Sequence, residues 1–447
     1  MKTCPNAYLP PWSAPFIGRH AGILREVVFA PHSPENAGLY YGTATVADTG
    51  ILTGTGRWSP PTGGVGTSAE AAVQSAIGEA FERYCAAFPP ASIQGTFTSL
   101  EKRAAAVRPS HLSSFSEEQL RRFKVPFVDV DELSLRWYRG TDLTGARQVY
   151  VPAAWVTLPY AGTDYQTVGN TTGLACGKTW DDAAFNAVME VVERDAYAQT
   201  WLFKGRPPRV SIEKTDFWKA LAPVVPVHPG QMTVYDLTGT LSIPVFLVAL
   251  RVPRNGAKKG EPDTWYCHGA AAHLNGTIAV RKALFEACLT INYLKQLRYT
   301  RPSAWSTDKG LSDVADFEAH AIFYNAAADR RRHLSFIDRG DLIDWQDAPG
   351  ARVIPYDVRS KRLSAARLLG DAQIPGAVID LTTEDIRPSG LKVARALLEG
   401  FAWLHGDHRR PFLGTPRMRA PHTHFPFIDP PKDIIENCTN PWPHAIA

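Results

Sequence analysis

Two segments of the sequence place carboxylates at the same spacing on a helical pattern. The first set is Ser75, Glu79, Glu82 and Arg83, and the second is Asn186, Glu190, Glu193 and Arg194. At about 100° per residue, positions i, i+4 and i+7 lie on one face of an α-helix. The opposite face is apolar in both segments. Each segment therefore predicts an amphipathic helix with a polar stripe that carries two glutamates.

Four carboxylates that face one another repel strongly unless cations neutralise them. Paired oxygen ligands suit Mg²⁺, which keeps several waters and completes its shell with substrate phosphates. Two such stripes across a cleft would hold a nucleoside triphosphate through two Mg²⁺ ions, and arginine would offset the remaining phosphate charge. If the stripes face each other, the pattern predicts ATP chemistry without a phosphate-binding loop.

An acidic stripe on a single helix usually marks only a solvent-exposed face. Two features favour a functional interpretation here. The three polar positions and the trailing arginine recur with identical spacing, which is typical of a duplicated element. The stripes also begin with Ser75 and Asn186 rather than with the lysines that a solvated face usually carries at this spacing.

A glycine-rich segment before the second helix resembles a Walker A loop. It runs from Gly173 to Thr179, but only three residues separate Gly173 from Gly177 where the motif needs four. No downstream strand ending in aspartate supplies a Walker B partner. We therefore expect no true P-loop, although Lys178 or backbone N–H groups could still contact a phosphate at the helix N-terminus.

The elements that must position these residues follow an α+β pattern, because strands and long helices interleave without a strict β-α-β rhythm. The first helix is expected from Thr67, with Glu70 completing a capping box, to the stop at Pro89-Pro90. The second is expected at 180–202, opened by Thr179 and Asp182, and a third at 277–297. Strands are expected at 23–29, 39–47, 125–130, 136–139, 148–156, 232–237 and 243–250.

No long linker divides the chain, so the sequence predicts one large domain with a duplicated helix motif. We place an N-terminal extension at residues 1–66, the catalytic domain at 67–415 and a proline-rich C-terminal tail at 416–447. The proline content of the tail argues against regular structure, and leaves both an ordered and a flexible tail open.

Composition excludes several functional classes. The chain has 447 residues and a net charge of only +4, which argues against a nucleic-acid coat or a polybasic membrane binder. Its six cysteines are scattered and never form a C-x-x-C pair, as expected for reduced thiols. No signal peptide and no run of 18 or more apolar residues is present. We therefore expect a cytoplasmic protein that binds neither nucleic acid nor membrane.

At this point the motifs resemble the YcaO superfamily, and within it the azoline-forming cyclodehydratases (D-protein type) that modify ribosomal peptides. The resemblance covers roughly residues 60–415. The matching segments are Gly64-Val-Gly66 followed by SAIGEAFER, then GLACGKTWDDAAFNAVMEVVERDA, then HGAAAHLNGTIAVRKALFEA, and finally DLTTEDIRPSGLKVARALLEGF. Together these motifs are specific, whereas any one of them alone is weak.

The resemblance implies roles for individual residues. ATP is expected to be held by Ser75, Asn186, Arg194 and Asp182, the last of which stands where the family often has glutamate. Two Mg²⁺ ions are expected on Glu79, Glu82, Glu190 and Glu193. The family's C-terminal P-x-P-x-P motif, which reaches towards the active site, is broken here by Ala445 after Pro441 and Pro443.

The reaction implied is an ATP-driven ring closure. A Cys, Ser or Thr side chain of a precursor peptide attacks the preceding backbone carbonyl, the carbonyl oxygen is phosphorylated, and loss of phosphate leaves a thiazoline or oxazoline. The resemblance also implies a homodimer. Because the 66 residues before the first signature are too few for a leader-binding ThiF-like region, a separate protein of that type is expected to present the precursor.

Several alternatives remain open at this stage. The core motifs do not distinguish azoline formation from thioamide or macrocyclic amidine formation on the same activated amide. A non-catalytic scaffold and an ATP-dependent ligase of small molecules are further possibilities, although the intact carboxylate set argues against the scaffold. No general base is identified, and the candidates by residue type are His268, His273, His422, His424 and His444. The H-x-x-H pair His405 and His408 has no third ligand in sequence and predicts a surface loop.

Overall fold

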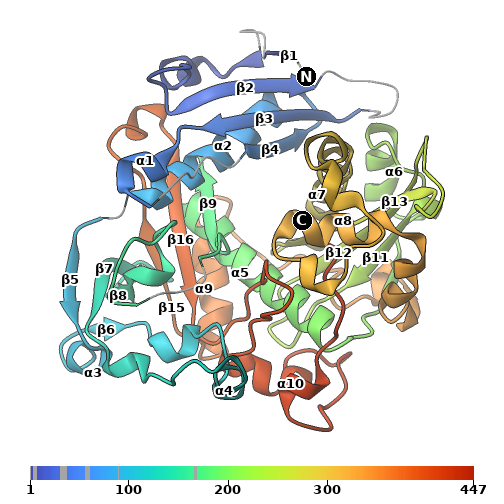
Figure 1. The fold of residues 1–447 in the computed structure, drawn as a ribbon. Coiled ribbons are helices and arrows are strands. Elements are labelled where there is room, and N and C mark those ends of the chain that lie inside the picture. The colour runs from blue at the N-terminus through green and yellow to red at the C-terminus, as the bar shows by residue number, and fades with distance from the viewer. Residues whose placement is uncertain are drawn as a thin grey trace. The chain divides into compact units, whose positions relative to one another are not determined.

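The computed structural model describes residues 2–3, 8–30, 38–55, 61–88, 90–165 and 169–446, without the side chains of residues 2, 3 and 61. These residues form two compact units. The first comprises Met1–Val191 and Pro355–Phe401, and the second Val192–Ile354 and Ala402–Ala447. The helix α5 (Trp180–Leu202) begins in the first unit and continues into the second. Figure 1 draws α5 as a long green helix.

The first unit contains an antiparallel sheet that covers the helix α2 (Ala69–Ala87). Its strands in spatial order are β1 (Lys2–Thr3), β2 (Leu24–Ala30), β3 (Tyr40–Val46) and β4 (Pro61–Gly66). In Figure 1 this sheet lies beside α2, and α2 contacts β2, β3 and β4. The apolar face of α2 is buried under it, including Val73, Ala76 and Ile77 at 0% exposure. The sheet thereby leaves the polar stripe of α2 on another side of the helix.

Glycine allows β4 to approach α2 unusually closely. A Cβ atom on Gly64 would lie 2.2 Å from the carbonyl oxygen of Ala72 and 2.4 Å from the amide nitrogen of Ala76. Thr62 adds a hydrogen bond from its hydroxyl to the carbonyl oxygen of Ala76, at 2.9 Å. The first signature is therefore glycine-rich because backbone packs on backbone at this point.

The second sheet of the first unit has seven strands. Their order is β6 (Ala105–Ala106), β8 (Gln148–Pro152), β7 (Leu135–Asp142), β15 (Gly376–Asp380), β16 (Lys392–Leu398) and β9 (Leu174–Gly177), and β5 (Ser92–Gly95) pairs with β7. The other helices of this unit are α1 (Thr49–Thr53), α3 (Phe97–Leu100), α4 (Glu117–Phe123) and α9 (Lys361–Asp371). The strand β9 contacts α2 and leads directly into α5.

The second unit is built on a five-stranded sheet. Its order is β13 (Thr264–Ala272), β12 (Val245–Pro253), β11 (Met232–Asp236), β10 (Arg209–Ser211) and β14 (Leu342–Asp344). The helix α7 (Gly276–Thr300) packs on β12 and β13, and the unit also contains α6 (Asp216–Leu221), α8 (Phe317–Ala326) and α10 (Ile435–Cys438). No strand was expected at β13, whose nine buried or half-buried residues show no alternation. The strands also absent from the expected set are β1, β4, β5, β6, β9, β10, β14, β15 and β16.

The α+β prediction is confirmed, and most predicted elements are found within a few residues of their expected bounds. The strand expected at 125–130 is wrong, since this segment has no strand and Val125, Phe127 and Val128 are about half exposed or more, at 49%, 61% and 48%.

The cap of α2 also differs from the expected one. Ser68 accepts a hydrogen bond from the Ala71 amide, so the capping box of Thr67 with Glu70 is not formed.

The C-terminal segment is ordered within the second unit. Tyr324 donates a hydrogen bond to the carbonyl of Pro443, at 2.7 Å, and the amide of His268 donates one to the carbonyl of Ala445, at 3.1 Å. Residues 443–446 are buried. Of the two possibilities left open for the proline-rich tail, the ordered one is therefore correct. The predicted domain boundaries at 66 and 415 stay predictions.

Two expectations from composition concern the whole chain. All five cysteines in the described part of the chain are free thiols, and Cys4 lies outside it. None of the helices that the structure describes is long and apolar enough to cross a bilayer. The expected cytoplasmic location itself stays a prediction.

Candidate functional site: a carboxylate cluster beside two arginines

Glu79 is held in place by the strand beneath it and by its own helix. The amide of Gly63 in β4 donates a hydrogen bond to its Oε2, at 2.9 Å. Arg83, one turn along α2, donates from Nη2 to its Oε1, at 3.0 Å. The carboxylate is thus oriented from two sides while remaining half-buried.

Glu82 accepts a hydrogen bond from the strand β9 and interacts electrostatically with Glu79 and with Glu190 on α5. The amide of Cys176 in β9 donates a hydrogen bond to Glu82 Oε1, at 2.7 Å. The pKa of Glu82 is raised well above its ordinary value, first by burial and then by the negative charges of Glu79 and Glu190. The charge of Arg83 and the Cys176 hydrogen bond oppose this rise without cancelling it. The structure therefore brings together Glu79, Glu82 and Glu190, as the facing stripes required.

The remaining glutamate follows on α5. Glu193 lies three residues after Glu190, which places the two side chains on one face of this helix. Glu193 is only 6% exposed, and its Oε1 lies 3.2 Å from Nε of the neighbouring Arg194. This ion pair orients Arg194, which the family resemblance assigns to ATP binding.

The other predicted ATP residues differ in their surroundings. Ser75 is exposed on α2. The amide nitrogen Nδ2 of Asn186 lies 3.5 Å from the carbonyl oxygen of Cys176, so it lies near the same strand as Glu82. Asp182 is engaged elsewhere, because Lys361 contacts its carboxylate at 2.7 Å and Thr179 donates a hydrogen bond to it at 2.9 Å.

The segment that resembles a Walker A motif is a strand. Residues 174–177 form β9, which pairs antiparallel with β16, and Gly173 has a φ of +83° just before it. The Cys176 amide is occupied by Glu82, and Lys178 is exposed. The structure thus agrees with the expectation that this segment is not a phosphate-binding loop.

Sequence analysis missed Arg395, which lies in β16. Its side chain is 1% exposed, and Nη2 donates to the carbonyl oxygens of Trp155 and Asn170. Among the described residues, neither Nε nor Nη1 of Arg395 has a hydrogen-bond partner, and the same holds for Nη1 of Arg83. A cation inside the otherwise apolar run VARALL was the available signal, because arginine is rarely buried in a strand without a purpose.

The electrostatics tie Arg395 to the carboxylates. Burial lowers its pKa to about 10, the negative charge of Glu190 counteracts this, and the positive charge of Arg83 adds to it. The buried guanidinium of Arg395 and the half-buried guanidinium of Arg83 therefore lie near the carboxylate cluster, each with N–H donors that have no partner among the described residues. This donor set fits the proposed ligands, since carboxylate oxygens bind Mg²⁺ and guanidinium groups bind phosphate oxygens.

Three of the five histidines considered as general bases are already engaged or deeply buried. His268 is fully buried between the hydroxyls of Tyr197 and Tyr266, at 2.9 and 2.7 Å, and burial lowers its pKa to about 3. Burial also lowers the pKa of His444 to about 4. His273 accepts a hydrogen bond from the Asn275 amide. No general base is identified among the described residues.

The fold and the carboxylate cluster define an α+β nucleotide-dependent protein without a P-loop, and comparison with known families agrees. A family model described as YcaO cyclodehydratase, ATP- and Mg²⁺-binding, matches residues 63–402. The chain therefore belongs to the YcaO family. The ATP and Mg²⁺ expected from the sequence are the ligands by which this family is described.

Two curated proteins are similar to parts of the chain. An uncharacterized protein of Methanothermobacter thermautotrophicus is 30% identical over 231 residues, which is 50% of this chain and 55% of that protein. An uncharacterized protein in the tfuA 3′ region of Rhizobium leguminosarum bv. trifolii is 28% identical over 208 residues, which is 42% of this chain and 49% of that protein. The matches thus span about half the length of these relatives.

Solved structures show the same fold. A heterocyclase in complex with substrate and cofactor has a TM-score of 0.73 at 21% identity, over 96% of this chain and 56% of that one. The YcaO protein of Methanopyrus kandleri bound with AMPPCP and Mg²⁺ has a TM-score of 0.59 at 18% identity, over 87% and 89%. A chain of the E. coli microcin synthetase McbBCD complex has a TM-score of 0.51 at 14% identity, over 86% and 88%. Together with the family, these likenesses support an ATP-dependent enzyme.

Proposed function

We propose that this protein is an ATP-dependent cyclodehydratase that converts Cys, Ser or Thr residues of a ribosomal precursor peptide to thiazolines or (methyl)oxazolines. The observation that carries the proposal is the gathering of Glu79, Glu82 and Glu190. The Gly63 amide binds Glu79 and the Cys176 amide binds Glu82, and the charges of Glu79 and Glu190 add to the burial that raises the pKa of Glu82. A cluster that repels its own charge in this way is stabilised by divalent cations. The arginines beside it complement the phosphates that such cations bind.

The proposed residue roles are those that the family resemblance implies. Mg²⁺ would be held by Glu79, Glu82, Glu190 and Glu193, and ATP by Ser75, Asn186, Arg194 and Asp182. Asp182 is the least available of these residues for ATP, because its carboxylate already contacts Lys361. The missed Arg395, whose Nε and Nη1 have no hydrogen-bond partner within the described residues, joins the set as a phosphate contact.

The work of the chain in this reaction is positioning and charge neutralisation. ATP supplies the phosphoryl group that turns the amide oxygen into a leaving group. Glu79 is oriented by Gly63 and Arg83, and Glu82 by Cys176, so the ligand geometry is set before substrates arrive. The buried guanidinium of Arg395 would stabilise negative charge in surroundings where water competes little.

The partners proposed are the precursor peptide, a separate leader-binding ThiF-like protein and a second copy of this chain. Two of the similar solved structures support the first two in general terms. One is a heterocyclase in complex with substrate, and another belongs to a synthetase complex of several proteins. Homodimer formation rests on the family resemblance alone and is tested by the mass of the protein in solution.

The proposal is tested by mass spectrometry of a precursor peptide incubated with the chain, its partner protein, ATP and Mg²⁺. Each azoline removes the mass of one water. The double variant Glu79→Gln plus Glu190→Gln should lose this activity by at least about 100-fold, because Mg²⁺ loses two charged ligands. Glu70→Gln is the matched control, since Glu70 is an exposed glutamate in the first turn of the same helix.

The same spectra separate the alternatives. A product in which sulfur replaces oxygen would indicate thioamide formation, and a water loss that maps to an amine would indicate an amidine. Unchanged activity of the double variant would contradict the carboxylate site. A protein that binds no Mg²⁺–ATP and changes no peptide would instead be a scaffold.

A further inference from the structure

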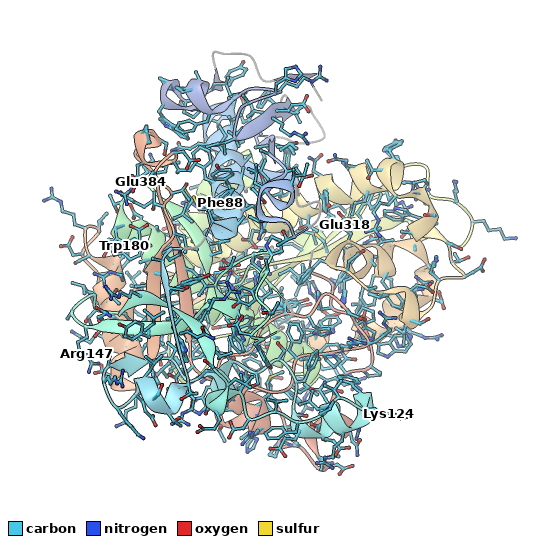
Figure 2. The ribbon with its side chains drawn as sticks, turned by 60° about the vertical axis from the view of Figure 1, so that its left-hand side comes forward. Phe88, Lys124, Arg147, Trp180, Glu318 and Glu384 are labelled. Atoms are coloured by element: carbon cyan, nitrogen blue, oxygen red, sulfur yellow. The ribbon has the colours of Figure 1, made fainter. Side chains whose placement is uncertain are left out.

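A second cluster of ligand-type side chains lies in the second unit, apart from the glutamates. It consists of His320 on α8 and of His405 and His408 in the segment that follows β16. Glu318, labelled in Figure 2, marks the first turn of α8 two residues before His320. One ring nitrogen of each histidine lies within 4.8 Å of the others. A third histidine thus lies beside the H-x-x-H pair, and His405 is buried rather than exposed in a surface loop as expected, although the pair does lie in an irregular segment.

Burial makes this cluster costly unless its nitrogens are bound. His320 is 0% exposed and His405 is 3% exposed. Within the described part of the chain, no hydrogen-bond partner meets either ring nitrogen of His320, Nδ1 of His405 or Nδ1 of His408. The backbone of His444 lies close to the His320 ring. Each unsatisfied buried polar atom costs about 1–3 kcal/mol, so a structure rarely keeps several together.

A hydrogen bond fixes the tautomer of His408 in a form that leaves Nδ1 able to bind a metal ion. Its Nε2 lies 3.0 Å from the carbonyl oxygen of Pro441, which can only accept a hydrogen bond. The proton therefore belongs on Nε2, and the lone pair on Nδ1 is left free. Metal-binding histidines are typically held in this way, with one nitrogen donating to a carbonyl and the other facing the ion.

Burial lowers the pKa values of His320, His405 and His408. Neutral imidazole is the form that binds a metal ion.

We propose that His320, His405 and His408 form a binding site for one transition-metal ion, with Zn²⁺ as the expected occupant. Three imidazoles without a carboxylate suit Zn²⁺ and exclude Mg²⁺, which requires oxygen ligands. A tetrahedral Zn²⁺ with bonds of about 2.0–2.1 Å brings its nitrogen ligands to roughly 3.4 Å from one another. The ligand nitrogens, which now lie within 4.8 Å of one another, would move closer by up to about 1.4 Å when the ion binds. A water or hydroxide would complete the shell.

The three histidines contact the C-terminal segment, residues 441–446. His408 contacts the carbonyl of Pro441, and His444 stacks on His320 with ring centroids 3.8 Å apart. Nε2 of His444 also lies 3.0 Å from the carbonyl oxygen of His405. Two residues of the C-terminal segment thus contact all three ligands. A bound ion would couple the packing of α8 to that of residues 441–446.

Metal analysis of the full-length chain, purified without a histidine tag and without chelators, tests this proposal. We expect about one equivalent of Zn²⁺ per chain, and a visible d–d spectrum of tetrahedral type after replacement by Co²⁺. His408→Gln should lower the zinc content at least about tenfold, since it removes one of three ligands. His20→Gln is the control, because His20 is exposed and lies in the other unit.

Two further measurements keep the test decisive. Chelation should lower the melting temperature of the wild-type chain and expose its C-terminus to carboxypeptidase, while the melting temperature of His408→Gln should not respond to chelator. Zinc-free wild-type protein that shows no Co²⁺ spectrum would overturn the proposal and identify the cluster as packed neutral imidazoles. The outcome is independent of ATP turnover, so failure here leaves the proposed function untouched.

Discussion

At the level of single residues, the pKa of Glu82 links the structure to the proposed chemistry. Burial and the charges of Glu79 and Glu190 raise this pKa, although Arg83 and the Cys176 amide lower it. A stable protein tolerates such crowding when a ligand relieves it, and clusters with perturbed pKa values are enriched at functional sites. Divalent cations are the ligands that fit this donor set.

The glutamates were predictable because their spacing repeats, whereas Arg395 and His320 were not. Arg395 belongs to β16, about 200 residues after Glu190, and only the fold brings the two into electrostatic contact. His320 lies on α8, more than 80 residues before His405 and His408, and only the fold brings it beside them. Helical periodicity reports neighbours along one helix and gives no information on such distant partners.

Substitution of Arg395 tests its place in the site. Arg395→Lys keeps the positive charge but loses the guanidinium donors Nε and Nη1, which have no other partner in the described structure. We expect the KM for ATP to rise about 10-fold or more, as for loss of a charge-assisted hydrogen bond of about 1.5–3 kcal/mol. ATP titrations of peptide-dependent phosphate release measure this.

Arg387→Lys is the control for that experiment, because Arg387 pairs with Glu384 at an exposed position of the same unit. The melting temperatures of both variants show whether the fold is retained. An unchanged KM in a folded Arg395→Lys protein would remove this arginine from the site.

At the level of elements, the contact between β4 and α2 positions the first carboxylate pair. Gly64 lets the strand backbone lie against the helix backbone, and the preceding Gly63 amide binds Glu79. Both long helices were predictable because their apolar faces follow the helical period. The strand expected at 125–130 was not formed, because its apolar residues are largely exposed and no neighbouring strand pairs with them in the described structure. Apolar composition indicates a strand only where a sheet is available to accept it.

Gly64→Ala tests the importance of this close approach. The new Cβ would lie 2.2 Å from the Ala72 carbonyl oxygen, so β4 must move away from α2. We expect a loss of about 1–3 kcal/mol in the free energy of unfolding. Weaker binding of Mg²⁺–ATP should accompany it, because Gly63 moves with the strand.

Gly370→Ala is the matched control for this prediction. Gly370 lies in α9, and a Cβ there would meet no atom within 4 Å. Alanine favours a helix by about 1 kcal/mol over glycine, so this variant should be neutral or stabilised. Denaturant unfolding compares the two variants, and equal stabilities would show that the β4–α2 contact is not close in solution.

At the level of the whole molecule, a net charge of +4 conceals strongly uneven local charge. A chain that is nearly neutral overall gathers several glutamates, and their negative charge, at one site. The α+β class was predictable from the order of the elements. The ordered C-terminal segment was not, because its proline-rich sequence forms few regular elements and is fixed by contacts within the second unit. Composition alone does not reveal such contacts.

Burial of His268 predicts how the stability of the chain depends on pH. Its pKa is lowered to about 3, so the unfolded chain binds a proton that the folded one does not. The stabilisation is complete above the unfolded pKa of about 6.5 and is lost as the pH falls towards 3. Between about pH 5.5 and 4, wild type should lose up to about 1.4 kcal/mol per pH unit more than His268→Asn. Denaturant unfolding at several pH values measures the difference in slope, and parallel slopes would contradict it.

The central claim is that the chain uses ATP to activate a backbone amide of a peptide. A precursor peptide labelled with ¹⁸O in the carbonyl that precedes the reacting residue tests it most directly. The account predicts one ¹⁸O atom in the released inorganic phosphate for each ring formed, and none with the Glu79→Gln plus Glu190→Gln variant. Unlabelled phosphate, released at the same rate with or without peptide, would contradict the account.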